Sequence, residues 1–303
     1  MEQAQNRYHI YRRITDQIAA AIAAGAPTFE MPWHRPGLAI PVNVMTTKPY
    51  RGINVLSLWV TSQVRGYGGG YWATYWQWAK LGAQVRKGEV GSAIVFYKQI
   101  ERTSAPDDSV AEEPEKYLIA KASFVFNADQ VDGWRPPQTV GSPRPPALIV
   151  DHAEQFVQGI GADIRETDGD ACYLPRPDYI RMPRRDLFVG SSTSTATEAY
   201  YATLFHELIH WTAHESRLAR DLSQRFGDEA YAMEELVAEL GAAFLCAENE
   251  ITNSPRVDHA AYVASWLAVL GGDAKAIVTA AGRASAAVQF LNDRSAHELN
   301  RSE

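Results

Sequence analysis

One short motif limits the folds available to this chain more than any other feature of its sequence. Residues 204–214 read LFHELIHWTAH, with His206 and His210 four residues apart and Glu207 beside the first histidine. On an α-helix, residues four apart lie on the same face, one turn above each other. The two imidazoles can therefore occupy two corners of a tetrahedral zinc site, with Glu207 as a general base beside the metal.

A zinc site of this kind needs a third protein ligand, and the helix predicted over residues 228–248 can supply it. Glu235 and Glu239 lie four apart there among apolar residues, where a buried carboxylate is costly unless a charge compensates it. We assign Glu235 as the third metal ligand and Glu239 as the acceptor for the remaining N–H of a ligand histidine. The two roles could be exchanged. Glu234 is expected to face solvent.

Other interpretations of the motif remain open from the sequence. His214 is not a suitable third ligand, because two helical turns, about 12 Å, separate it from His206. A metzincin-like site would need a glycine turn and a later histidine in the metzincin pattern, and the segment HWTAHESRLAR supplies neither. The histidines could also be ordinary helix residues without a metal, or ligands in a domain without activity. In an active domain, zinc-bound water would attack a peptide carbonyl, and residues 172–183, CYLPRPDYIRMP, could supply an edge strand for an extended peptide.

The charge of the chain is divided unevenly between its two halves. Residues 1–100 hold 11 Lys and Arg but only 4 Asp and Glu, a formal charge of +7. The whole 303-residue chain carries −7, which leaves −14 for the remainder. Such a division suggests that the amino-terminal half meets a polyanion and the other half does not.

The same amino-terminal half is rich in aromatic rings, which suggests that the polyanion is single-stranded DNA. Five of the eight tryptophans precede residue 100. Unpaired nucleic acid needs aromatic faces for its bases and cations for its phosphates. The candidate DNA-binding residues are Trp33, Arg35, Lys48, Tyr50, Arg51, Trp72, Trp76, Arg86 and Lys87. For any one ring, a place in the core is the alternative; we expect Trp59 in the core, and Trp76 and Trp78 cannot both point inward from one short helix.

The chain is predicted to be a two-domain α+β protein. We expect a DNA-binding domain over residues 1–135, a proline-rich linker over 136–146, and a mostly helical zincin-like domain with a small sheet over 147–303. The predicted helices are 8–24, 53–65, 150–159, 196–214, 228–248, 259–270 and 273–291, and the clearest strands are 92–100 and 117–127. The sequence has no transmembrane run and no apolar signal-peptide core, so we expect a cytoplasmic protein without a membrane partner.

Five segments together resemble the ArdC-type antirestriction proteins of conjugative plasmids. They read PWHRP, KPYRGINVLSLW, WATYWQWAKLGAQVRKGEVGSAIVFYK, FVFNADQVDG and FHELIHWTAHESRL. The resemblance implies an N-terminal single-stranded-DNA-binding domain, related to one in plasmid primases, and a C-terminal zincin-like metalloprotease domain. It also implies protection of incoming plasmid DNA from host restriction enzymes. His206, Glu207 and His210 match the family's HExxH, and Glu235 matches its glutamate helix.

These observations predict a zinc-dependent metallopeptidase that binds single-stranded DNA and counters restriction. Its partners would be the unpaired strand and, as substrate or target, host restriction enzymes or other DNA-bound proteins. Two alternatives have different functions. The first is a DNA-masking protein whose zinc is only structural, and the second is a DNA-activated protease that acts on proteins bound to DNA.

Overall fold

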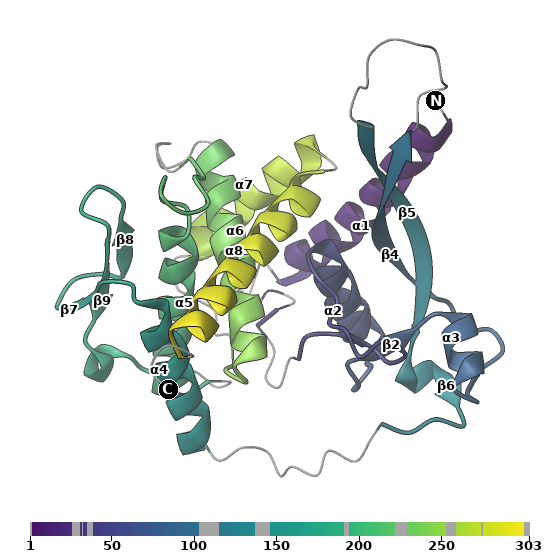
Figure 1. Cartoon of the computed structure of the whole chain (residues 1–303), viewed down its shortest axis with the longest axis horizontal. Helices are drawn as coiled ribbons and strands as arrows, with labels where there is room; N and C mark the ends of the chain where they lie inside the picture. The colour runs from purple at the N-terminus through teal and green to yellow at the C-terminus, as the bar shows by residue number, and fades with distance from the viewer. Residues whose placement is uncertain are drawn as a thin grey trace.

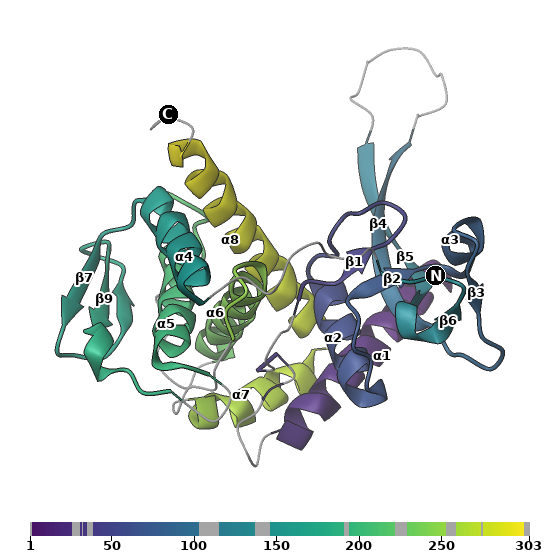
Figure 2. The same cartoon turned by 90° about the horizontal axis from the view of Figure 1, so that it is seen from below.

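The protein has two halves, each with its own sheet, that pack against each other through helices (Figures 1 and 2). The computed structural model describes residues 2–25, 31, 33–34, 39–102, 115–136, 146–190, 194–221, 229–252, 259–273 and 275–299. Both views place the long β4–β5 hairpin at one end of the molecule and the strands β7 to β9 at the other, with helices between them. No helix in these described ranges is both long and apolar enough to cross a bilayer.

The amino-terminal half is an α+β unit around a four-stranded sheet of order β1-β2-β5-β4. Only β1 and β2 run parallel; β5 is antiparallel to both of its neighbours. A two-stranded sheet, β3 and β6, lies beside it. The elements are α1 (Glu2–Gly25), β1 (Val42–Asn43), α2 (Ile53–Arg65), β2 (Tyr71–Ala73), α3 (Tyr75–Lys80), β3 (Gln84–Val85), β4 (Ser92–Arg102), β5 (Glu115–Asn127), η1 (Ala128–Gln130) and β6 (Val131–Asp132).

The carboxy-terminal half is mostly helical, with a three-stranded sheet of order β7-β9-β8. In this sheet β7 runs parallel to β9 and β8 runs antiparallel to it, so β8 forms an edge. The elements are α4 (Pro146–Ile160), β7 (Ile164–Thr167), β8 (Cys172–Leu174), β9 (Tyr179–Pro183), η2 (Arg185–Leu187), α5 (Ala196–Trp211), α6 (Glu229–Glu248), α7 (His259–Gly272) and α8 (Ala276–Leu299).

Several elements follow from local sequence signals. The runs rich in β-branched and aromatic residues at 92–100 and 117–127 form the hairpin β4–β5, paired from Ser92 with Val125 to Arg102 with Glu115. Thr74 caps α3: its hydroxyl accepts the Gln77 N–H at 3.3 Å, and the Gln77 side chain accepts the Thr74 N–H at 2.9 Å. The strand β7 was not predicted from the sequence. The sequence also predicts an acidic loop over residues 101–116, of which residues 103–114 lie outside the described residues, as does most of the predicted linker.

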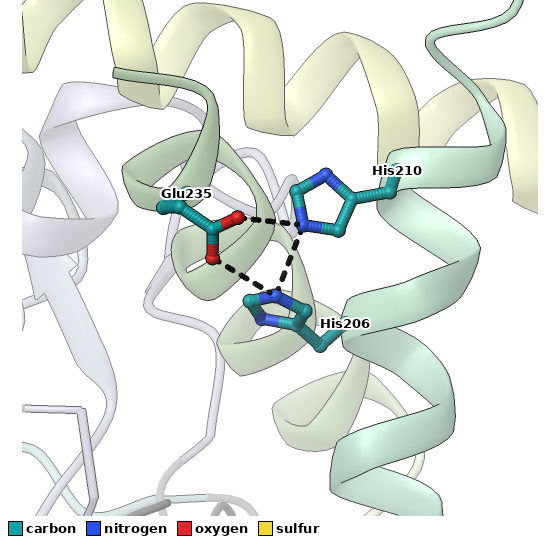
Figure 3. Close-up of side chains that lie close together, drawn as sticks. All are labelled: His206, His210 and Glu235. Carbon is teal, nitrogen blue, oxygen red and sulfur yellow. Dashed lines mark hydrogen bonds and ion pairs between the residues drawn. The ribbon is translucent and has the colours of Figure 1, made fainter. Parts of the chain in front are cut away.

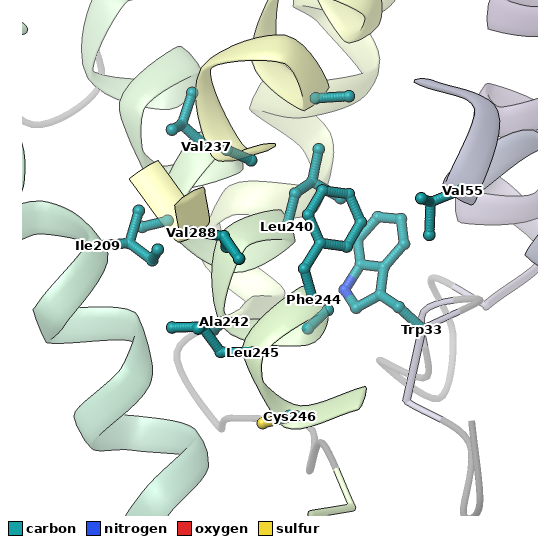
Figure 4. Packing of buried hydrophobic residues seen from close by; sticks show 14 of the residues in the cluster. Trp33, Val55, Ile209, Val237, Leu240, Ala242, Phe244, Leu245, Cys246 and Val288 are labelled. Atoms are coloured by element: carbon teal, nitrogen blue, oxygen red, sulfur yellow. The ribbon is translucent and has the colours of Figure 1, made fainter. Parts of the chain in front are cut away.

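The two halves share one apolar core. Helix α1 packs against α7, and α2 packs against α8. The Trp59 ring on α2 lies 5.6 Å from the Phe244 ring on α6, between centroids. Figure 4 shows Trp33 and Val55, from the amino-terminal half, in the same cluster as Leu240 of α6. The predicted two-domain α+β architecture is confirmed, and the helices of the two domains bury a common surface.

Helices α5 and α6 approach each other closely at a glycine. A Cβ atom built on Gly241 of α6 would lie only 2.6 Å from Cδ1 and 2.7 Å from Cγ1 of Ile209 on α5. Carbon atoms normally approach to about 3.5–4.0 Å. The absence of a side chain at Gly241 therefore lets the two helices pack at a distance that places their polar side chains face to face.

Candidate metal centre

Helices α5 and α6 bring His206, His210 and Glu235 together in the buried space between them (Figure 3). The Nε2 atoms of the two histidines are 3.1 Å apart. The Glu235 carboxylate faces both: Oε2 lies 3.5 Å from His206 Nε2, and Oε1 lies 3.5 Å from His210 Nε2. The predicted third ligand therefore lies where a shared ion would require it.

The two histidine nitrogens and the Glu235 carboxylate, with one oxygen facing each ring, fit a divalent metal ion. Ligands of a tetrahedral zinc ion with bonds of ~2.1 Å are separated by about 3.4 Å, close to the 3.1 Å and 3.5 Å found between these atoms. The Nδ1 atoms of both rings face other carboxylates, which favours N–H groups at Nδ1 and leaves the Nε2 lone pairs directed at each other. Two lone pairs and a carboxylate at these distances repel one another unless a cation lies between them.

Two further glutamates of α6 face the outer nitrogens of the ligand histidines. Glu239 Oε2 lies 3.8 Å from Nδ1 of His206, an ion-pair distance that is longer than a hydrogen bond. The role of Glu239 as acceptor for this N–H stays a prediction. Glu234 Oε1 lies 3.3 Å from Nδ1 of His210. The expectation that Glu234 faces solvent is wrong: it is 7% exposed, because Arg220 pairs with both of its carboxylate oxygens, at 3.0 Å and 2.8 Å. The same guanidinium donates to the Ile209 carbonyl near the end of α5.

The electrostatics of this cluster attract positive charge. Burial acts to lower the pKa of His210, but the charge of Glu235, together with hydrogen bonds to Glu234 and Glu235, raises that pKa to about 10. Burial acts to raise the pKa of Glu235, but the charge of His210, together with hydrogen bonds to His206 and His210, outweighs burial and lowers the pKa. Both directions have one cause, the attraction between the buried carboxylates and a positive charge among the histidines, which a proton or a metal ion can supply.

Glu207, the predicted general base, is buried beside the ligand histidines. Its Oε2 accepts the backbone N–H of Tyr173 in β8 at 2.8 Å. This hydrogen bond joins β8, an edge strand of the small sheet, to the helix that carries the ligand histidines. The predicted edge strand within 172–183 is thus present, and it lies directly against the base.

The amino-terminal half also contributes to the site, which the sequence did not indicate. The indole Nε1–H of Trp33 donates to Glu239 Oε1 at 2.8 Å, and His34 Nε2 lies 2.8 Å from the same oxygen. The prediction that Trp33 stacks on DNA is contradicted by its complete burial in this contact. No sequence signal links positions separated by 206 residues.

The remaining predicted DNA-binding residues fall into three groups. Trp72 and Tyr50 are buried, so neither ring offers a face to a base, and this part of the prediction is wrong. Arg35 lies outside the described residues. The exposed members are Lys48, Arg51, Trp76, Arg86 and Lys87. The expected division between two tryptophans of α3 is confirmed: Trp76 is 76% exposed, whereas Trp78 is buried.

A run of rings that the sequence interpretation did not single out continues from Trp76. Tyr75 lies 5.9 Å from Trp76 and 6.5 Å from Phe126, between ring centroids, and Phe124 lies two residues before Phe126, on the same face of β5. Tyr75 is 43% exposed and Phe124 is 49% exposed. We call Trp76, Tyr75, Phe126 and Phe124 the aromatic strip. The alternation of a strand and the cap of a short helix were the signals that could have identified it.

Two family descriptions together match most of the chain. Residues 8–126 match the N-terminal domain of anti-restriction factor ArdC, and residues 151–283 match a zincin-like metallopeptidase domain. The predicted boundaries, 1–135 and 147–303, stay predictions.

Proteins of similar sequence include one that the chain matches over nearly its whole length. The chain is 45% identical to the uncharacterized protein y4eC of Sinorhizobium fredii (strain NBRC 101917 / NGR234), across 93% of this chain and 91% of that protein. It is 34% identical to a DNA primase TraC of Escherichia coli, across 95% of this chain but only 27% of the primase.

Two solved structures of an antirestriction protein match almost the entire chain in both sequence and fold. The crystal structure of the metal-free antirestriction protein ArdC from plasmid R388 is 39% identical, with a TM-score of 0.74, and the match covers 95% of this chain and 98% of that one. A Mn(II)-bound structure of the same protein matches with 38% identity and a TM-score of 0.72, over 94% of this chain and 98% of that one. This likeness in both sequence and fold shows that the chain belongs to the ArdC family of antirestriction proteins, with a zincin-like carboxy-terminal domain.

Proposed function

We propose that this protein is a zinc-dependent metallopeptidase that binds single-stranded DNA and protects incoming plasmid DNA from restriction in the cytoplasm. The observation that carries the peptidase assignment is the convergence of His206, His210 and Glu235 beside Glu207. Two imidazoles and one carboxylate are a ligand set that zinc favours, and a zincin leaves its fourth position open.

The residues of the chain supply the acid–base chemistry. Zinc, when bound, would lower the pKa of a coordinated water to about 7 and polarise a peptide carbonyl. Glu207 would take the proton from that water on its carboxylate and deliver it to the leaving amine. The N–H of Tyr173 holds Glu207 Oε2 and so fixes the orientation of the base. The edge strand β8 offers backbone groups to which an extended peptide can be added.

The aromatic strip supports the DNA-binding part of the proposal. Tyr75, Trp76 and Phe124 are exposed, so each of these rings is accessible to an unpaired base that stacks on it. Helix α3 packs against β3, and the exposed Arg86 and Lys87 directly follow β3. A Cβ atom at Gly91 would lie 3.0 Å from Phe124 Cβ, which is closer than normal packing allows. The glycine therefore lets the backbone at residue 91 pass close beside the aromatic strip.

A labelled single strand titrated at two salt concentrations tests this part. Phosphate contacts release counterions, so binding should weaken steeply as salt rises. A flat response to salt would show that the basic half does not bind a nucleic-acid backbone.

A second candidate function is a DNA-masking protein in which the metal only joins α5 to α6. The burial of Glu207 and its hydrogen bond to Tyr173 favour this candidate, because a catalytic base must reach both a water and a substrate. Under this alternative, protection comes from coverage of the entering strand.

The Glu207→Gln variant separates the two functions. Loss of a general base lowers turnover by about 10²–10⁴-fold, whereas the amide keeps the shape of the side chain and leaves the three metal ligands in place. The assay is plasmid transfer into a restricting host, with elemental analysis of the purified variant. A variant that retains zinc and protects fully would exclude proteolysis as the basis of protection; a variant that retains zinc but protects poorly supports it.

A further inference from the structure

The segment around Trp33 and His34 reaches from the amino-terminal half into the carboxy-terminal helices and ends on a single carboxylate. Both side chains contact Glu239 Oε1 at 2.8 Å. All three residues are buried, and Trp33 belongs to the apolar cluster that both halves share (Figure 4). A buried carboxylate oxygen with two N–H partners has one preferred orientation.

The protonation of His34 follows from its other hydrogen bond. Its Nδ1 lies 3.1 Å from the backbone N–H of Met31 and accepts from it. The proton of the neutral ring therefore lies on Nε2, which donates to Glu239. Because Trp33 also donates, Oε1 of Glu239 is fully engaged, and Oε2 is the oxygen that faces Nδ1 of His206 at 3.8 Å.

We propose that Trp33 and His34 are positioning residues of the metal centre. They fix Glu239, Glu239 orients the imidazole of His206, and the amino-terminal half thereby sets the metal affinity of the carboxy-terminal half. This inference rests on the proposed zinc site and adds to it. Residues that orient a ligand histidine typically contribute 10–100-fold to metal affinity, and these two act on such a residue.

The zinc affinity of the full-length protein tests the proposal, measured by competition with a chelating dye. His34→Leu removes the donor but keeps an apolar side chain, and it should weaken zinc binding by about tenfold. Trp33→Phe removes only the indole N–H and should weaken binding severalfold. His34→Gln restores an N–H donor of similar reach and should return the affinity to within about threefold of the original protein.

A double-variant comparison shows whether the effect passes through Glu239. Glu239→Gln alone should weaken zinc binding by about 10–100-fold. Adding His34→Leu to Glu239→Gln should cause little further loss, whereas independent effects would multiply. A purely structural role for His34 would lower the unfolding temperature without this non-additive pattern in affinity.

Trp59→Phe is the matched control. Trp59 is also buried in the shared core and donates its indole N–H, but to the Ala39 carbonyl at 2.9 Å. Its loss should lower stability and leave zinc affinity unchanged.

If Trp33→Phe and His34→Leu bind zinc as tightly as the control, the positioning role is wrong while the zinc site stands. If the unchanged protein binds no zinc, the proposed metallopeptidase itself fails. If the His34→Leu variant does not fold, the zinc affinities of Trp33→Phe and His34→Gln can still be compared with that of the Trp59→Phe control, and this comparison tests the positioning role.

Discussion

The close contact between α5 and α6 makes a prediction whose sign can be worked out from the structure. Alanine normally stabilises a helix interior relative to glycine by about 0.5–1 kcal/mol. At Gly241 the added methyl would lie 2.6 Å, 2.7 Å and 3.1 Å from Cδ1, Cγ1 and Cγ2 of Ile209. Rotation of the Cδ1 methyl relieves only the first of these contacts, because the β-branched side chain is stiff at χ1.

The helices must therefore move apart, and overpacking of this kind costs about 1–3 kcal/mol. With the gain in helix propensity subtracted, Gly241→Ala should lower the free energy of unfolding by up to about 2.5 kcal/mol. Ile209 lies between His206 and His210 on α5, so a separation of the helices also moves the histidines away from Glu235. We expect weaker metal binding together with lower stability.

Urea unfolding with metal removed by a chelator measures the first effect, and dye competition measures the second. Gly282→Ala is the matched control: this glycine lies within α8, is exposed, and has nothing within 4 Å of an added Cβ. The control should gain about 0.5–1 kcal/mol. Ile209→Ala removes all three clashing atoms, so its combination with Gly241→Ala should be more stable than the two separate effects predict. A Gly241→Ala protein as stable as the Gly282→Ala control, with unchanged metal affinity, would refute the close approach.

Three further predictions address the metal, the DNA surface and the pH dependence of stability. Glu235→Ala should abolish stoichiometric zinc in elemental analysis, whereas His214→Ala should retain it; equal metal contents would remove Glu235 from the ligand set. Trp76→Ala should weaken single-strand binding by about 1–3 kcal/mol, or about 5–150-fold, measured by fluorescence anisotropy, while the equally exposed Val189→Ala in the other half should not; identical affinities would exclude Trp76 from the interface. Hydrogen bonding from Arg217 lowers the pKa of Asp178, so this pair stabilises the fold above the carboxyl's unfolded pKa and the contribution is lost as pH falls through the lower, folded value. Asp178→Asn, which tolerates the positive φ of 52° at this position, should therefore lower stability at neutral pH and reduce its dependence on pH at the acid end; thermal unfolding from pH 2 to 7 with the same slope as the original protein would contradict this.

Features that depend only on neighbours within a few residues follow directly from the amino-acid sequence. Helical periodicity places His206 and His210 on one face wherever that helix packs. The cap at Thr74 and the hairpin of β4 and β5 likewise need only their own residues. Charge on an apolar helix was enough to identify Glu235 and Glu239 as candidates beside the metal, because a buried carboxylate requires a compensating partner.

Which groups from distant segments meet depends on the packing of the whole chain. Glu234 and Glu235 are adjacent in the sequence, and both face α5 because Arg220 closes over the first. From the sequence, Trp72 and Trp76 are equally good candidates for stacking on DNA bases. In the structure, Trp72 is buried in the sheet, whereas Trp76 is exposed on the helix. Trp33 and His34 reach Glu239 only because the two halves share a core. Local geometry fixes the direction of a side chain relative to its own helix or strand, whereas its partner across the molecule depends on how all the buried surfaces pack together.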